Sequence, residues 1–226
     1  MKHFCIVASL CLLSALAVQA TPVTVQELSV SPSKVVGISV TGFYTGNVYA
    51  GINNLLVNNV AANGFCIDPF HFSIGGPQPY ESVPLEQAPK DDHLITGTHM
   101  TTGEAALIGK LWAMAYSDIG SDAERAAAFQ IAIWEIVGGS YFHVTSSTDY
   151  GASLLLSQAM AYSGPGANLV ALTGPGQDYV IGGPSSVPDS GTTAMLLASA
   201  LGALFVARRF GEPARTEVSE RSNPSR

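Results

Sequence analysis

Alternation of apolar and polar side chains dominates the part of the chain that follows residue 20. The candidate strands are residues 23–25, 28–30, 35–44, 48–60 and 65–72. Because successive side chains of a strand point to opposite faces, this pattern predicts a set of β-strands. Pro69 indicates that the last of them ends there or lies at a sheet edge. The proline-rich stretch at 75–92 predicts a long loop.

The spacing of apolar residues becomes helical in the middle of the chain. Thr101 and Glu104 form a predicted capping box before one helix, and Ser121 and Glu124 form another before a helix over 122–137. The remaining predicted elements are a helix at 149–162 and closing strands at 169–173 and 178–181. Strands, then helices, then strands predict a single α+β domain over residues 21–181.

Each end of the chain carries an apolar segment. Residues 1–20 have a basic start, a short apolar run and small residues at the end, which predicts a cleaved signal peptide rather than an uncleaved anchor. Residues 192–207 contain no charge and precede Arg208 and Arg209. This order predicts a transmembrane helix with the domain outside and a basic, polar tail at 208–226 in the cytoplasm. A buried core helix is the alternative for this segment.

A short motif precedes the predicted membrane helix. The linker at 182–191 ends in Val187, Pro188, Asp189, Ser190 and Gly191. The order of motif, apolar segment and arginine pair resembles the sorting signal of exosortase substrates, the PEP-CTERM group, in its Val-Pro-Asp-Ser-Gly variant. The resemblance implies an exported protein with a single pass through the inner membrane of a Gram-negative-type bacterium. It also implies a sorting enzyme of the exosortase type as partner, with release to the cell surface or extracellular matrix as a further step.

Composition narrows the choice of partners. The net charge is -7, only 12% of residues are charged, and no basic stripe is present, so we expect no binding to nucleic acid. With the end segments set aside, roughly 165 residues remain, enough for one domain with a core. The chain has no phosphate-binding glycine loop, zinc-type cysteine pair or nucleophile elbow. We therefore expect no cofactor, no metal and no enzymatic turnover.

One cysteine remains once the signal peptide is removed. Cys5 and Cys11 lie in that segment, which leaves Cys66 without a partner for an internal disulfide. Gln130 lies on the apolar face of the helix predicted at 122–137, where an amide is costly unless it is satisfied. Either the amide is hydrogen-bonded to nearby backbone, or it is consumed in a bond to the cysteine.

The local sequences around these two residues are similar to those of a known family. Residues 65–68 read Phe-Cys-Ile-Asp and residues 128–134 read Ala-Phe-Gln-Ile-Ala-Ile-Trp. The pair resembles the signature of bacterial surface thioester domains. The resemblance implies a Cys66–Gln130 thioester, with Trp134 packing one turn further along the helix. As a hypothesis, Asp68 or a backbone amide near it polarises the bond.

Such a domain is expected to attach covalently or adhesively to an amine- or hydroxyl-bearing partner at the cell surface or in a matrix. Two alternatives stay open. The first is a structural matrix protein in which the crosslink is only a stabilising staple or does not form. The second is a cysteine peptidase. A peptidase requires a histidine base, and a metal site requires clustered ligands. The candidates for these roles are Asp68, His71, His93, His99 and His143.

Overall fold

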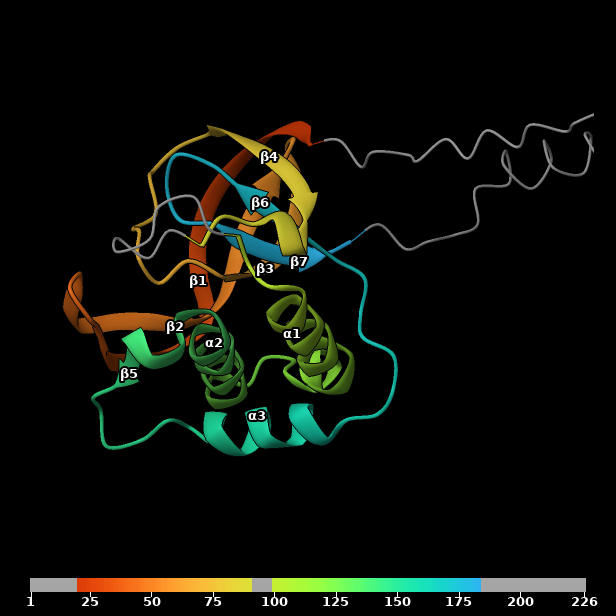
Figure 1. Ribbon diagram of the computed structural model, residues 1–226. Helices are drawn as coiled ribbons and strands as arrows, with labels where there is room; N and C mark the ends of the chain where they lie inside the picture. Colours follow the sequence, from red (N-terminus) through yellow and green to blue (C-terminus); the bar gives the residue numbers. More distant parts are fainter. Residues whose placement is uncertain (1–19, 91–98, 184–226) are drawn as a thin grey trace, which may run out of the picture. The chain divides into compact units, whose positions relative to one another are not determined.

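A computed structural model describes residues 20–90 and 99–183 (Figure 1). The strands are β1 (Thr21–Val40), β2 (Tyr44–Val57), β3 (Val60–Cys66), β4 (Gln78–Pro84), β5 (Phe142–Val144), β6 (Leu169–Thr173) and β7 (Tyr179–Gly182). The helices are α1 (Thr102–Ala115), α2 (Ala123–Gly138) and α3 (Ala152–Ala161). The predicted signal peptide, sorting motif, transmembrane segment and tail lie outside the described residues.

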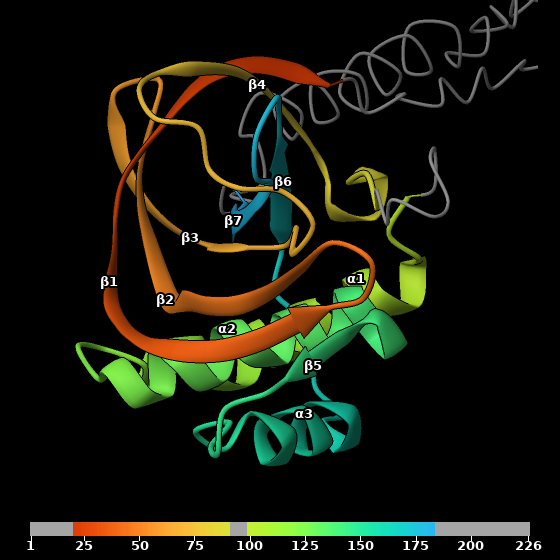
Figure 2. The ribbon, with the colours of Figure 1, turned by 90° about the vertical axis from the view of Figure 1, so that its left-hand side faces the viewer.

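The strands pair into a sheet that closes on itself. The sheet order is β2-β3-β7-β6-β4-β1-β5, and β1 pairs with β2 as well as with β4. All of these pairings are antiparallel. The chain of pairings from β1 through β2, β3, β7, β6 and β4 therefore returns to β1. Figure 2 shows these strands curving into a ring, with the helices gathered beside it.

Two apolar cores fill this arrangement. A small cluster takes one residue from each of five strands of the ring and lies inside it: Val25, Leu55, Tyr80, Leu172 and Tyr179. The larger cluster lies between the sheet and the helices. The middle helix α2 is buried from Ala126 to Gly138 except at Glu135, so it packs against the sheet on one side and against α1 and α3 on the other. Burial of this helix in the middle of the domain fixes the position of Gln130 firmly.

The α+β prediction is confirmed for the described domain, with some corrections. The predicted loop at 75–92 contains β4, whose Tyr80 and Val83 are buried. Its two prolines are compatible with a strand because Pro79 pairs only with β1 and Pro84 is the last strand residue. The strand predicted at 65–72 ends earlier, at Cys66. The short strand β5 was not predicted.

The helix starts test the two capping predictions. The Thr101–Glu104 box before α1 is confirmed, because Thr101 accepts from the Glu104 N–H and the Glu104 carboxylate accepts from the Thr101 N–H. The Ser121 box before α2 is wrong. Asp122 is the N-cap, and its carboxylate accepts hydrogen bonds from the N–H groups of Glu124 and Arg125. A carboxylate one residue nearer the helix accepts both bonds and complements the helix dipole.

Candidate functional site

Cys66 is the last residue of β3, at a point where the sheet is paired on one side only. On one side β3 pairs with β7 as far as Cys66, which lies opposite Tyr179. On the other side the pairing with β2 stops two residues earlier, at Gly64 opposite Asn53. The Ile67 N–H donates to the Asp178 carbonyl at 3.0 Å, on the β7 side. Because backbone groups of successive strand residues point to opposite sides, the N–H and C=O of Cys66 point to the second side, away from β7. The strand therefore leaves two buried polar groups to be satisfied.

The side chain of Gln130 satisfies both groups. Its Oε1 accepts from the Cys66 N–H at 2.9 Å, and its Nε2 donates to the Cys66 carbonyl at 2.8 Å. The carboxamide thus takes the place that a peptide group of β2 would fill if the ladder continued. Both residues are buried, with Gln130 1% and Cys66 2% exposed. The structure brings the two predicted residues together across a separation of 64 positions.

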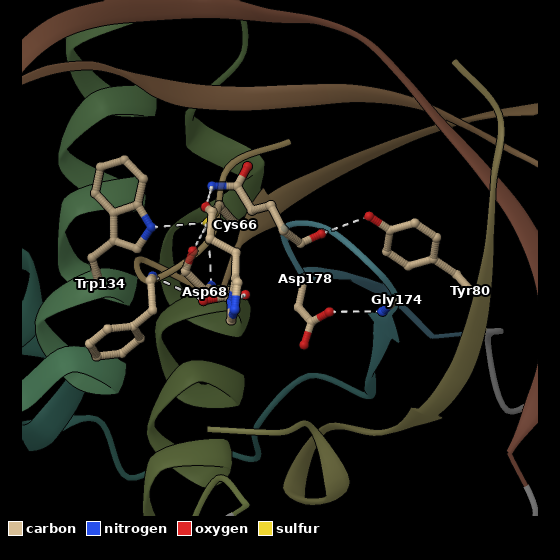
Figure 3. Close-up of polar contacts among 9 residues, drawn as sticks. Cys66, Asp68, Tyr80, Trp134, Gly174 and Asp178 are labelled. Atoms are coloured by element: carbon tan, nitrogen blue, oxygen red, sulfur yellow. Dashed lines mark hydrogen bonds and ion pairs between the residues drawn. The ribbon is translucent and has the colours of Figure 1, made fainter. Parts of the chain in front are cut away.

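Two N–H donors surround the sulfur of Cys66. The indole Nε1–H of Trp134 donates to Sγ at 3.2 Å (Figure 3), and the backbone N–H of Asp68 donates to it at 3.3 Å. The thiol in turn donates to the Asp68 carbonyl at 3.2 Å. Burial raises the pKa of the Cys66 thiol well above its ordinary value, and the charge of Asp68 adds to this, while the Trp134 hydrogen bond acts in the opposite direction. The sulfur therefore remains a protonated thiol whose two donors favour any negative charge that develops on it.

Asp68 shapes the turn that follows Cys66. One carboxylate oxygen accepts from the Phe70 N–H at 3.0 Å, and the other lies 2.7 Å from His71 Nδ1. Burial raises the pKa of Asp68, and the neighbouring His71 partly offsets this. The Asp68 N–H donates to the sulfur of Cys66. That Asp68 or a backbone amide near it polarises the bond stays a prediction.

Asn53 and Asp178 are two site residues that the sequence did not single out. In the amide orientation that satisfies both neighbours, the Asn53 nitrogen donates to Glu27 Oε1 at 3.3 Å and its oxygen accepts from the Cys66 N–H at 3.3 Å. Asp178 is buried just before β7, where it accepts from the Gly174 N–H at 3.0 Å (Figure 3). Burial raises the pKa of Asp178 to about 8, and the charge of Asp68 contributes to this. Asn53 lies inside β2.

A cavity of about 140 Å³ leads to the pair, and both Cys66 and Gln130 line it. Aromatic side chains form much of its wall: Phe43, Tyr44, Tyr49, Phe72 and Trp134. Tyr49 and Phe72 are exposed, and the Phe72 ring packs edge-on against that of Tyr44, with centroids 5.4 Å apart. The pair is thus buried in the fold but adjoins an aromatic-walled cavity that a slender group can enter.

The residues considered for a cysteine peptidase or a metal site have other contacts. The hydrogen-bond partners of Cys66 Sγ, within residues 20–90 and 99–183, are Trp134 and the Asp68 backbone, neither of which is a base. Asp68 and His71 are in contact, His99 Nδ1 lies 3.1 Å from the Gln87 carbonyl, and His93 lies outside the described residues. In that part of the chain no group of three or more His, Cys, Asp or Glu residues is arranged to hold a metal ion.

Comparison with protein families matches the VPDSG-CTERM motif at residues 186–209. The match supports the predicted PEP-CTERM type of sorting: an exported, membrane-associated surface protein recognised by an exosortase-type enzyme. Helices in the described residues are all too short or too polar to cross a membrane, and the segment predicted to do so, 192–207, lies outside them. No curated protein and no solved structure matches the chain.

Proposed function

We propose that Cys66 and Gln130 form an internal thioester through which this exported protein attaches once, covalently, to an amine- or hydroxyl-bearing partner at the cell surface or in the matrix. The observation that carries the proposal is the pair of hydrogen bonds between the Gln130 amide and the Cys66 backbone, at 2.9 and 2.8 Å. They hold the Gln130 carboxamide against the backbone of Cys66, the residue that carries the thiol. Both ends are rigid, one on a strand and one on a buried helix, as proximity catalysis requires.

The bond-forming step balances without an added reagent. The sulfur of Cys66 attacks the carboxamide carbon of Gln130, the carbon–nitrogen bond breaks, and the thiol proton leaves with the nitrogen as ammonia. The Cys66 N–H already donates to Gln130 Oε1, so it is aimed at the oxygen on which negative charge develops. The donors on the sulfur, from Trp134 and Asp68, stabilise the same sulfur when it later departs as a thiolate.

Attachment to a partner reverses part of this sequence. A nucleophile from the partner attacks the acyl carbon of Gln130, the carbon–sulfur bond breaks, and the thiol of Cys66 is regenerated. The aromatic-walled cavity that reaches Cys66 and Gln130 supplies the path for such a group. Each domain reacts once, because the product is a stable amide or ester that leaves no thioester behind.

A structural role is the second candidate, and the burial of the pair favours it. Gln130 and Cys66 are only 1% and 2% exposed, and the hydrogen bonds already satisfy the amide. In that case the contact joins β3 to α2 as a staple, with or without the covalent bond. The cavity beside the pair is what a purely structural staple does not require, and it favours the reactive function.

Intact-mass measurement of the purified full chain tests the proposal, beside its Cys66→Ala and Gln130→Ala variants. A thioester makes the parent lighter by one ammonia than its calculated mass, and neither variant shows this loss. Treatment of the folded parent with methylamine then adds one methylamine to Gln130 and frees one thiol. A staple resists methylamine until the protein is unfolded. A parent of full mass, with a thiol that alkylates readily in the folded protein, would overturn the proposal.

A further inference from the structure

Glu27 is the one carboxylate among the described residues that line the cavity beside the proposed thioester. Those residues include no lysine or arginine. A single side chain connects Glu27 to the reactive pair, because the Asn53 amide lies between Glu27 Oε1 and the Cys66 N–H, at 3.3 Å from each. The described wall of the cavity therefore carries negative charge close to Cys66, which favours a cationic visitor over a neutral or anionic one.

The backbone directs Glu27 towards the inside of the ring. Glu27 lies two residues after Val25, which belongs to the small core within the ring, so the two side chains share a face. The β1–β2 register then shifts between Glu27 and Ser29, so that Leu28 is an extra residue in β1. Bulges of this kind re-aim side chains beside functional sites. An acid on an otherwise apolar face is costly unless it is held or used.

Tyr179 and Asn53 hold the carboxylate in place. The Tyr179 hydroxyl donates to Glu27 Oε2 at 3.0 Å, and the Asn53 amide nitrogen lies 3.3 Å from Oε1. Burial holds the pKa of Tyr179 above its ordinary value, and the charge of Glu27 adds to this, so the hydroxyl keeps the proton that it donates. Tyr179 also lies opposite Cys66 in the β3–β7 pairing, which ties the position of the acid to that of the thiol.

The shape and walls of the cavity match a slender cation. Its volume of about 140 Å³ is well below the roughly 300–1,000 Å³ that encloses a drug-sized ligand. An unbranched alkyl chain fits such a space better than a sugar ring. The aromatic rings of the wall offer favourable contacts to an ammonium group that enters over a ring face: Phe43, Tyr44, Tyr49 and Phe72. Besides Glu27, the wall contains four other titratable side chains: Tyr44, Tyr49, Cys66 and His71. Of these, His71 is in contact with Asp68.

We propose that Glu27 receives the ammonium group of an unbranched primary amine, takes up its proton, and so directs the Cys66–Gln130 bond towards cationic amines and away from hydroxyl groups. This inference rests on the proposed thioester and names its substrate class and a proton acceptor. The ammonium transfers one proton to the Glu27 carboxylate and becomes a neutral amine. Its nitrogen attacks the acyl carbon of Gln130 and the carbon–sulfur bond breaks. The second nitrogen proton goes to the departing sulfur, and Glu27 returns its proton to solvent.

The experiment compares two amines of different charge on the full chain. Butylamine is a cation at neutral pH, whereas methoxyamine is a neutral amine. Intact mass first establishes the loss of ammonia in the parent and in each variant, and the rate of adduct formation is then measured for both amines and for butanol. Glu27→Gln should slow the reaction with butylamine by at least about 100-fold and leave the rate with methoxyamine within about twofold of the parent. The exposed Glu86→Gln, in the short 3-10 helix Leu85–Gln87 that follows β4, is the matched control and should change neither rate.

Each result has a definite meaning. Equal slowing of both amines in Glu27→Gln, or no slowing of butylamine, would overturn the role of Glu27 while leaving the thioester intact. A parent that reacts with butanol as fast as with butylamine would overturn the selectivity. A parent of full mass would overturn the proposed function itself, and the inference with it. If Glu27→Gln does not form the bond, Glu27→Asp decides, since it keeps the charge one methylene further away and should give an intermediate selectivity for butylamine.

Discussion

Trp134 donates its indole N–H to the sulfur of Cys66, at 3.2 Å, from a position one helical turn beyond Gln130. One face of α2 thus carries both the carboxamide and a donor to the thiol. The sequence resemblance implied only a packing role for Trp134. The buried indole also packs against Phe142, with ring centroids 5.7 Å apart, and this contact holds the donor in place.

Trp134→Phe should slow aminolysis of the thioester with a modest effect on folding. The substitution removes the N–H that stabilises a departing thiolate and keeps an aromatic ring. A hydrogen bond to a charged group contributes about 1.5–3 kcal/mol, which corresponds to roughly 10- to 100-fold in rate. The measurement is the methylamine adduct rate by intact mass. A rate equal to that of the parent would show that the indole N–H has no part in the reaction.

Gln130→Leu should lower the free energy of unfolding more than Cys66→Ala does. Both variants prevent the crosslink, but only the first removes the donor to the buried Cys66 carbonyl, while the Cys66 N–H keeps the Asn53 oxygen as an acceptor. An unsatisfied buried group costs about 1–3 kcal/mol, so the difference between the variants should be roughly that size. Urea unfolding gives the values, with the exposed Gln158→Leu on α3 as the control for the change of side chain. Equal stability of the two variants would contradict the bridging role of Gln130.

Asp178 should make the folded domain less stable as the pH rises. Burial, with a contribution from Asp68, raises its pKa from 3.8 to about 8. The folded protein therefore holds an extra proton between these values, and the free energy of unfolding falls as pH increases through that window. Below pH 3.8, the contribution of Asp178 to the free energy of unfolding is fully present. The effect is on the order of a few kcal/mol, given about 1.4 kcal/mol per unit and partial relief by solvent.

The matched variant is Asp178→Asn, which keeps an acceptor for the Gly174 N–H. Denaturant unfolding at pH 5 and at pH 8 should show a smaller loss of stability in the variant than in the parent. Asp68, whose pKa burial also raises, should leave a residual dependence of the same sign. A pH dependence identical to that of the parent would mean that Asp178 is not the group responsible.

Gly64→Ala should disturb the end of β3 that carries Cys66. A methyl group at Gly64 would lie 2.8 Å from the Val180 carbonyl oxygen and 2.9 Å from a methyl carbon of Ile181, both on the adjacent β7. Because strand backbone cannot yield without loss of pairing, we expect a cost of about 1–3 kcal/mol and a lower fraction of protein with the thioester mass. Gly75→Ala meets no atom within 4 Å and is the control. Full stability of Gly64→Ala would show that the strands move apart without penalty.

Alanine substitution of Pro188 and Asp189 should block sorting without altering the domain. The family match at 186–209 covers this motif. We expect the variant to stay in the inner-membrane fraction without cleavage at the motif. Its domain should still show the loss of one ammonia at Cys66 and Gln130. Cell fractionation followed by intact mass tests this, with Ser185→Ala as a control outside the match. Normal release of the variant would show that the motif is not what the sorting enzyme reads.

Apart from β4 and β5, the order of elements followed from the sequence because each of the others rests on a local signal. Thr101 and Glu104 lie within one helical turn, and their capping box appears as predicted. Closure of the ring was not predictable, because it depends on pairing of Thr21–Val25 with β4, and β4 lies in a proline-rich stretch that reads as a loop. Its buried residues Tyr80 and Val83 are three positions apart, so β4 lacks the two-residue alternation that marks a strand in the sequence.

In the candidate site, too, local signals were readable from the sequence and strand pairing was not. Cys66 and Gln130 were paired by resemblance to a family signature, and they lie in contact. The geometry of that contact depends on β2 pairing ending at Gly64, a fact of register that no local pattern carries. Glu27, Asn53 and Asp178 were missed for the same reason. Each is a polar residue in or beside a strand, and its meaning comes only from the strand that lies opposite.

The position of β7 has a mechanical consequence. Its short span is hydrogen-bonded to β3 on one side and to β6 on the other, and in the sequence the sorting signal at 186–209 follows this strand. A pull along the strand from that end loads both ladders in shear, so their bonds resist together instead of breaking one by one. Cys66 lies directly opposite Tyr179 at the start of this strand. A surface protein tethered in this way would carry tension into the sheet beside one partner of the proposed Cys66–Gln130 bond.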